Sequence, residues 1–237
     1  MSTQHFTCYG PEVTVTGDPV HSDRLLLFVH GYNDDIADAR TAYNLFLDSY
    51  PALTARKVLS EVYDFGFVYW PGKVWNCLSF AAYAPEMREA EEAARRLALL
   101  LDIRERRKVS IIAHSMGNRF ALQLVSTTSR VEYERLILMA AAVPTAEVQP
   151  HTIYPDYSDA VREFTSTLCL YSPRDSVLRA AFPVGEFVGG DGPRLEAIGL
   201  EGRPDGLWTH TQNCLGYDHS DYWTRPQSVN EAVGFLK

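Results

Sequence analysis

The sequence predicts an α/β fold in which a mostly parallel, twisted sheet carries helices on both faces. Short, nearly continuous apolar runs alternate along the chain with amphipathic stretches of helical period. Runs that apolar are typical of strands buried on both faces, and such strands are joined by right-handed crossovers. No linker rich in Gly, Pro or Ser divides the 237 residues, so we expect a single domain over residues 1–237.

Most of the predicted strands are short runs of apolar and β-branched residues that end near a turn residue. Val13–Gly17 alternates between apolar and polar residues and is expected at an edge of the sheet. The core strands that follow are continuously apolar, and the last one is weaker. In chain order they are Arg24–Gly31, Phe65–Gly72, Lys108–Ser115, Arg135–Pro144, Ser166–Ser172 and Thr211–Gly216.

Amphipathic patterns predict the helices between these strands. Asp34 or Asp35 is expected to cap a helix that runs to about Tyr50. Its plausible inward positions are Ile36, Ala37, Tyr43, Phe46 and Leu47. The other predicted helices are Glu86–Leu101, Asn118–Thr128 and Ser228–Leu236.

The long second helix begins after Pro85, which suits a first helical turn. On its exposed face, Glu91 and Arg95 are spaced i,i+4, and so are Glu92 and Arg96. The residues expected on its buried face are Ala90, Ala94, Leu97 and Leu101.

The formal net charge of −8 argues against a nucleic-acid partner, which would require clustered Lys and Arg. The first residues lack the pattern of a signal peptide, and no apolar run is long enough to cross a bilayer, so no membrane partner is expected. Four widely spaced cysteines without a C-x-x-C motif indicate free thiols and a cytoplasmic location. The oligomeric state cannot be read from the sequence.

The run Ala113-His114-Ser115-Met116-Gly117 resembles the G-x-S-x-G motif called a nucleophile elbow. Small residues are needed two before and two after the serine, because the sharp turn from strand to helix presses them against neighbouring backbone. Such a turn lifts the Ser115 hydroxyl out of the sheet, and it aims the N–H of Met116 at a developing oxyanion. The alternative is that Ser115 only caps the helix.

The segment Phe28–Asn33 lies at the end of an earlier predicted strand and is well placed to supply a second oxyanion donor. Gly31 allows a tight turn there, which would offer the N–H of Tyr32. The residues expected around a substrate pocket are Gly31, His114 and Trp70, the last because it ends a predicted strand. The alternative is that His30 and Gly31 simply end their strand.

Four segments, LLFVHGYN, FVYWPG, IIAHSMGN and LILMAAAVP, occur in the order and at about the spacing found in the α/β-hydrolase superfamily. More narrowly, the chain resembles a bacterial hydrolase family of unknown function with an AHSMGN elbow. The resemblance covers roughly Leu25 to Trp223. It implies an α/β-hydrolase fold with an eight-stranded type of sheet and serine-dependent hydrolysis of esters or amides, and it supplies no substrate.

A serine hydroxyl needs a base within hydrogen-bond reach, and in this fold the order along the chain is Ser, then Asp or Glu, then His. Of the histidines after Ser115, His219 lies in the loop that follows the last predicted strand. It is the predicted base. His210, inside or just before that strand, and His151, before the best acid, are weaker candidates.

Asp175 is the predicted acid, because it lies in the loop after the penultimate strand, which matches the acid position of the family. The alternative is that Asp175 only caps a short helix from Ser176. Weaker candidates are Asp156 and Asp159, which precede that strand. Asp218 and Asp221 flank His219 too closely to turn back easily, although either could tune it.

These residues predict a serine hydrolase that cleaves a carboxylic ester or related acyl bond in a small-molecule substrate through an acyl-enzyme. Two alternatives stay open: an acyltransferase that uses the same triad, and a binding protein without catalysis on the same fold. No cofactor and no metal are expected, since no H-x-x-x-H or Cys/His set is present. Only about twenty residues, Pro144–Phe164, are available for a lid, which excludes a large cap domain.

Overall fold

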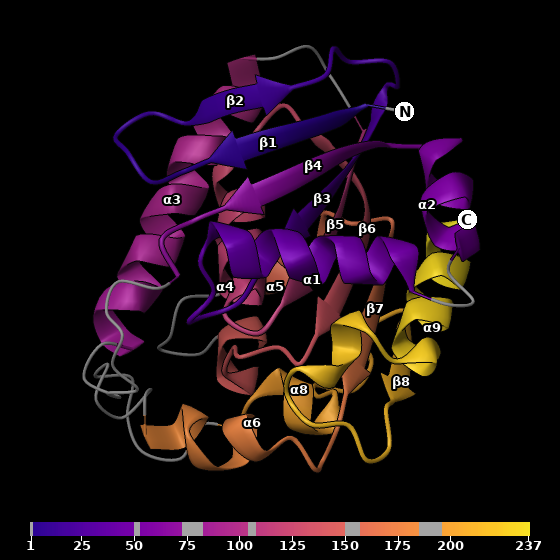
Figure 1. Cartoon of the computed structure of the whole chain (residues 1–237). Coiled ribbons are helices and arrows are strands. Elements are labelled where there is room, and N and C mark those ends of the chain that lie inside the picture. The colour runs from indigo at the N-terminus through magenta and orange to yellow at the C-terminus, as the bar shows by residue number, and fades with distance from the viewer. Residues whose placement is uncertain (1, 50–52, 73–82, 104–107, 150–156, 185–195) are drawn as a thin grey trace.

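The computed structural model describes the whole chain except residues 1, 50–52, 73–82, 104–107, 150–156 and 185–195. Figure 1 shows a twisted sheet between helices. The described strands form one eight-stranded sheet in the order β2-β1-β4-β3-β5-β6-β7-β8. β1 pairs antiparallel with β2, and all the other neighbours pair parallel. The strands are β1 Thr3–Thr7, β2 Thr14–Gly17, β3 Arg24–Val29, β4 Asp64–Tyr69, β5 Lys108–His114, β6 Glu132–Met139, β7 Ser166–Tyr171 and β8 His210–Asn213.

The helices form two layers, one on each face of the sheet. Helices α1, α2 and α9 cover one face, and α3, α4 and α5 cover the other (Figure 1). The longer helices are α1 Ile36–Asp48, α2 Leu53–Ser60, α3 Tyr83–Ile103, α4 Gly117–Thr127 and α9 Pro226–Leu236. The shorter ones are α5 Ser158–Arg162, α6 Ser176–Ala180, α8 Ile198–Glu201 and the 3₁₀ turns η2 Thr145–Val148 and η3 Asp221–Trp223.

This architecture confirms the predicted fold class, and β2 lies at a sheet edge as expected. The sequence did not reveal β1, which inserts between β2 and β4 and extends the parallel part of the sheet. β1 alternates between half-buried and buried positions, and Phe6 is its one strongly apolar residue. A single apolar side chain in so short a run is too weak a pattern to predict a strand.

Helix α1 begins as predicted and packs differently in its first turn. The Asp35 carboxylate accepts hydrogen bonds from the N–H groups of Ala37 and Asp38, at 2.8 and 3.0 Å, and so caps the helix. Tyr43, Phe46 and Leu47 are buried as expected. The inward placement of Ile36 and Ala37 is wrong, since both are exposed. They precede Ala39, the first buried residue of the helix.

The exposed face of α3 carries one of the two predicted i,i+4 ion pairs. Glu91 and Arg95 lie 3.6 Å apart. The pairing of Glu92 with Arg96 is wrong, because the Arg96 guanidinium turns toward Glu89, at 2.8 Å, and donates to the carbonyl of Cys8. Arg96 therefore ties α3 to the end of β1.

A short connection joins β6 to β7 over the carboxyl edge of the sheet. Its described residues form η2 and α5, and they include no cap domain. The buried carboxylate of Glu147 in η2 lies 2.9 Å from the buried guanidinium of Arg119 in α4. This ion pair fastens the connection to the helix that follows β5. In the described part of the chain, no helix has the length and apolar composition needed to cross a bilayer.

Two histidines are buried at the carboxyl ends of the central strands. Burial lowers the pKa of His30 to about 4 and that of His114 to about 3. The backbone N–H of Trp70 donates to His30 Nε2, so Nδ1 carries the proton and donates to the carbonyl of Gly31. A second proton on His30 would break the bond from Trp70, so the folded state holds this ring neutral.

We predict that replacing Gly66 by alanine destabilises the sheet. A Cβ on Gly66 in β4 would come within 2.5 Å of Leu27 and 3.0 Å of Phe6, which are both buried. Because packed cores resist added volume, Gly66→Ala should lower the free energy of unfolding by about 1–3 kcal/mol in urea titrations. Gly234→Ala is the control: it has open space in α9 and should keep or raise stability. Equal behaviour of the two variants would contradict this packing.

We also predict that stability falls as the pH drops below about 6.5. There an unfolded histidine binds a proton, while His30 and His114 remain neutral when folded. Above that pH, each neutral histidine makes its full contribution to the free energy of unfolding. At pH 5, each histidine has lost about 2 kcal/mol of that contribution. The unfolding free energy measured in urea should fall accordingly between pH 7.5 and pH 5. His30→Gln should reduce this fall, and His21→Gln, at an exposed position, should not; identical slopes in the two variants would refute the assignment.

Candidate active site

The turn between β5 and α4 holds Ser115 in the left-handed region of backbone space, with a φ of +54°. A residue with a side chain rarely adopts this conformation, and such strain is typical of a nucleophile elbow. Hydrogen bonds of the main chain fix it: Ser115 N–H donates to the carbonyl of Met139, and Ala142 N–H donates to the carbonyl of Ser115. The turn is therefore anchored to the end of the neighbouring strand β6.

Two glycines allow other segments to approach this turn. A Cβ on Gly117 would lie 2.3 Å from the carbonyl oxygen of His30 and 2.8 Å from that of Val29. A Cβ on Gly31 would lie 2.8 Å from the Cβ of Ser115. No side chain fits at either position, so the loop after β3 rests directly against the serine.

Asn118 supports the same turn, a role that the sequence did not reveal. Its side-chain amide donates to the carbonyls of Ser115 and Met139, at 3.0 and 3.2 Å. It is fully buried. The sequence does contain an indication of this role, because Asn118 is a polar residue that follows the elbow directly, at the predicted start of a helix.

The structure brings Ser115, His219 and Asp175 into hydrogen-bond contact. Ser115 Oγ lies 2.8 Å from His219 Nε2, and His219 Nδ1 lies 2.8 Å from the Asp175 carboxylate. Since a carboxylate only accepts, Nδ1 carries the proton, and Nε2 is left to accept from the serine hydroxyl. The Asp175 side chain is fully buried, while 17% of the His219 side chain is exposed.

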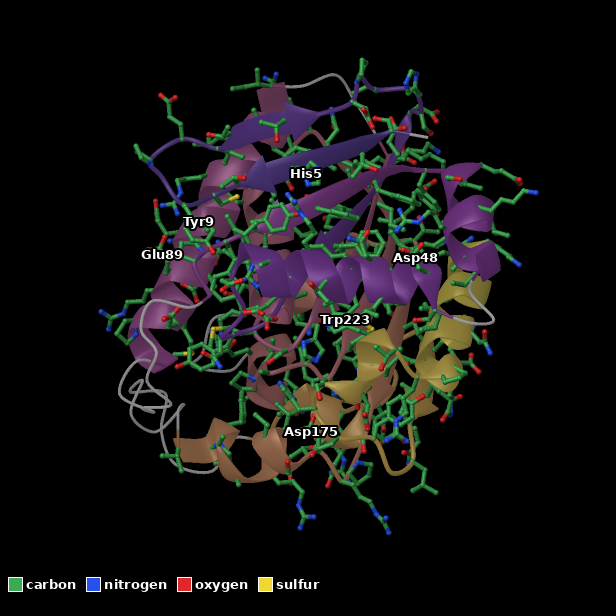
Figure 2. All side chains as sticks on the ribbon, viewed as in Figure 1. His5, Tyr9, Asp48, Glu89, Asp175 and Trp223 are labelled. Carbon is green, nitrogen blue, oxygen red and sulfur yellow. The ribbon has the colours of Figure 1, made fainter. Side chains whose placement is uncertain are left out.

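Asp175 also caps the short helix that begins at Ser176, as the alternative interpretation of this residue predicted. One of its oxygens accepts from the N–H of Leu178 at 2.9 Å and caps α6, while the other accepts from His219. Figure 2 labels Asp175 in the orange part of the chain, close to the yellow segment that carries Trp223. The cap fixes the carboxylate plane, which in turn orients the imidazole.

The predicted oxyanion donors lie at the ends of β3 and β5. Met116 is the N-cap residue of α4, and no described residue accepts a hydrogen bond from its N–H. Tyr32 is half-buried in the loop that Gly31 holds against Ser115. Both N–H groups therefore belong to segments that contact the serine.

Two of the residues predicted to line the substrate pocket, Trp70 and His114, are buried. Trp70 has no exposed surface; its indole stacks on the His30 ring with centroids 5.2 Å apart, and its Nε1–H donates to the carbonyl of His30. Trp70 packs behind the loop after β3, so the prediction that it lines the substrate pocket is wrong. His114 is buried too, and its Nε2 donates to the carbonyl of His219 at 2.7 Å.

Two of the weaker candidates, His210 and Asp159, lie away from the serine. His210 is exposed at the start of β8, the opposite end of the strand from the loop of His219. Asp159 lies on α5 and pairs with Arg162. His151 and Asp156 fall outside the described residues. The described residues include no group of three or more His, Cys, Asp and Glu side chains that could hold a metal ion.

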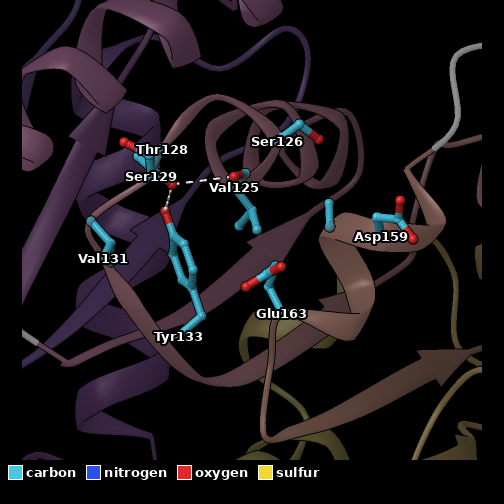
Figure 3. A pocket seen from close by; sticks show the side chains of 9 residues that line it. Val125, Ser126, Thr128, Ser129, Val131, Tyr133, Asp159 and Glu163 are labelled. Carbon is cyan, nitrogen blue, oxygen red and sulfur yellow. Dashed lines mark hydrogen bonds between the residues drawn. The ribbon is translucent and has the colours of Figure 1, made fainter.

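A separate surface pocket of about 420 Å³ lies where α4 ends and β6 begins (Figure 3). Tyr133 in its wall is near the start of β6, about 20 Å along the strand from Met139, which contacts the elbow. Its polar groups include the hydroxyl of Thr128, which is hydrogen-bonded to the hydroxyl of Tyr133 at 2.7 Å, and the carboxylates of Asp159 and Glu163. It is therefore distinct from the Ser115 site.

Comparisons with solved structures bear out the fold. A cold-adapted esterase from an Arctic intertidal metagenomic library is similar over 95% of this chain and 88% of its own, with 14% identity and a TM-score of 0.50. A protein from Thermus thermophilus, TT1662, is similar over 100% of this chain and 97% of its own, with 15% identity and a TM-score of 0.50. An uncharacterized protein from Bacillus cereus is similar over 93% of this chain and 61% of its own, with 14% identity and a TM-score of 0.52.

No curated protein gives a significant sequence match. A family match, in contrast, spans residues 17–204, which include Ser115 and Asp175 and end before His219. The eight-stranded sheet and the elbow after β5 agree with that match. The chain belongs to the family described as alpha/beta hydrolase of unknown function (DUF900).

Proposed function

We propose that this protein is a serine hydrolase that cleaves a carboxylic ester or a related acyl bond. The observation that carries the proposal is the unbroken relay of two 2.8 Å contacts, from Ser115 Oγ to His219 Nε2 and from His219 Nδ1 to Asp175. A serine hydroxyl becomes a useful nucleophile when a base accepts its proton and a carboxylate fixes the tautomer of that base. Membership of a hydrolase family supports hydrolysis as the reaction type.

In the proposed mechanism, Ser115 Oγ attacks the carbonyl carbon of the substrate while His219 Nε2 takes the hydroxyl proton. The buried Asp175 carboxylate stabilises the imidazolium, which then gives this proton to the leaving alcohol. His219 next takes a proton from water as the water oxygen attacks the acyl carbon, and it returns this proton to Ser115 Oγ when the bond between that oxygen and the acyl carbon breaks, which releases the acid. Each step uses the same Nε2, which the structure aims at the serine.

The oxyanion of each tetrahedral intermediate would be held by the N–H groups of Met116 and Tyr32. The N–H of Met116 lies at the N-terminus of α4, where the helix dipole favours negative charge. The close contact of Gly31 with Ser115 supports Tyr32 as the second donor. Preorganised donors of this kind are worth about 10²–10³ in turnover each.

The substrate that we propose is an uncharged small-molecule acyl compound. The formal net charge of −8 disfavours a polyanionic substrate and a nucleic-acid partner. We also propose a cytoplasmic location, supported by the buried free thiols of Cys8, Cys169 and Cys214. Recovery of the protein from a periplasmic fraction of the source cells would contradict this location.

We predict that removing either end of the relay abolishes ester hydrolysis while the fold remains. Ser115→Ala and His219→Ala should reduce turnover of chromogenic short-chain esters to the background rate. Asp175→Asn should reduce it on the order of 10⁴-fold, because the wrong imidazole tautomer then prevails. The measurement is steady-state kinetics with esters, thioesters and amides of varied acyl length, alongside circular dichroism.

Gln123→Ala, at a half-buried position of α4 where the side chain contacts Thr127 and Tyr157 and no member of the relay, is a suitable control and should retain the wild-type rate. Unchanged rates in Ser115→Ala or His219→Ala would refute the serine mechanism. Added alcohol or amine acceptors test the acyltransferase alternative: acyl transfer that outpaces hydrolysis would favour it. Absence of any acyl turnover in the wild-type protein would favour a binding protein without catalysis.

A further inference from the structure

The main chain of His219 is held on both sides by side chains that the relay does not use. Asp218 Oδ1 accepts from the backbone N–H of His219 at 2.9 Å. His114 Nε2 donates to the backbone carbonyl of His219 at 2.7 Å. Both polar groups of this peptide backbone are therefore fixed by side chains, although the residue lies in a loop.

His114 connects this backbone to the nucleophile, because it directly precedes Ser115. A carbonyl only accepts, so His114 carries its proton on Nε2. Its ring lies against those of Tyr222 and Trp223, with centroids 6.3 and 5.7 Å apart, and it is 5.0 Å from the His219 ring. This packing leaves the donor pointing at one acceptor.

Asp218 connects the same backbone to the acid, because it binds Ser176, the residue after Asp175. The Oδ1 atom that holds His219 N–H also accepts from Ser176 N–H at 3.0 Å and from Ser176 Oγ at 2.8 Å. The backbone N–H of Asp218 donates in turn to Asp221 at 2.9 Å. The loop of the base and the loop of the acid are thus joined through one carboxylate oxygen.

We propose that His114 and Asp218 are positioning residues that together set the distance between His219 Nε2 and Ser115 Oγ. The proposal rests on the serine-hydrolase function proposed above. Each contact in the relay has a second hydrogen bond beside it, made by the residue next to a relay residue. His114, next to Ser115, binds the main chain of His219. Ser176, next to Asp175, binds Asp218, which is next to His219. Rotation of the imidazole is then limited to its own side-chain torsions.

The protonation states of the two residues suit this role. Burial, with the neighbouring His219 as a second cause, lowers the pKa of His114 to about 3. His114 therefore stays neutral and does not repel the imidazolium that forms on His219. Hydrogen bonds from Ser176 and His219 lower the pKa of Asp218, which keeps its carboxylate ionised and accepting.

The first test removes the donor of His114. His114→Leu should lower kcat on a short-chain ester by about 10- to 100-fold and change KM less than twofold, since an error of about 1 Å in the catalytic geometry has an effect of this size. His114→Gln should restore most of the loss, because its amide nitrogen lies as many bonds from Cβ as Nε2 does. Tyr222→Phe is the matched control: it packs on the same ring, and its hydroxyl has no partner among the described residues.

The second test concerns the acceptor. Asp218→Ala should lower kcat by a similar factor, and Asp218→Asn, which keeps an acceptor oxygen, should lower it less. Asp159→Asn removes a carboxylate on the far edge of the sheet and should have no effect (Figure 3). Wild-type kcat in both His114→Leu and Asp218→Ala would overturn the proposal.

A readout without substrate separates this proposal from the proposed function. In proton NMR spectra, the Nδ1–H of His219 that donates to Asp175 should give a downfield resonance. His114→Leu and Asp218→Ala should shift it or speed its exchange with water, while Tyr222→Phe should not. An unchanged resonance in both variants would refute the positioning role. If the resonance responds and Ser115→Ala leaves hydrolysis unchanged, the proposed function fails and the positioning of His219 stands.

Discussion

The hydrogen bond between Ser115 Oγ and His219 Nε2 joins residues that lie 104 positions apart in the chain, and the arrangement of the site depends on it. It requires two conditions. Ser115 must keep a backbone conformation that most residues avoid, with a φ of +54°, and the loop after β8 must return over the carboxyl edge of the sheet. Parallel strands make this possible, because the loops that follow them gather at one edge.

The local packing explains how the strained conformation persists. In this turn, Ser115 N–H donates to the carbonyl of Met139 at the end of β6, and the Ser115 carbonyl accepts from the N–H of Ala142 and from the side-chain amide of Asn118. Gly31 and Gly117 let the loop after β3 press on it, where any Cβ would collide with neighbouring atoms. The neutral His30 ring and the indole of Trp70 support that loop from behind. Strain at one residue is thus balanced by contacts from three neighbouring segments.

Much of this could be predicted from the sequence, because strand and helix periods are local and the order Ser, Asp, His constrains the site. Such reasoning predicts the edge strand at Val13–Gly17, a helix cap at Asp34 or Asp35, and Asp175 and His219 as the acid and the base. The contacts of His114, Asp218 and Asn118 could not be predicted, since they depend on how loops from distant segments meet. The same reason explains the error at Trp70: the end of a strand indicates an edge of the sheet, while the surrounding loops decide whether a side chain is covered.

The measurement that tests the central claim most directly is covalent labelling with an alkyl fluorophosphonate, which reacts with serines whose hydroxyl is activated by a neighbouring base. Intact mass and peptide mapping then locate the adduct. The account predicts one phosphonyl group per chain, on Ser115, and none when His219 is replaced by alanine. A folded wild-type protein that takes up no label, or takes it up only at another residue, would contradict the account.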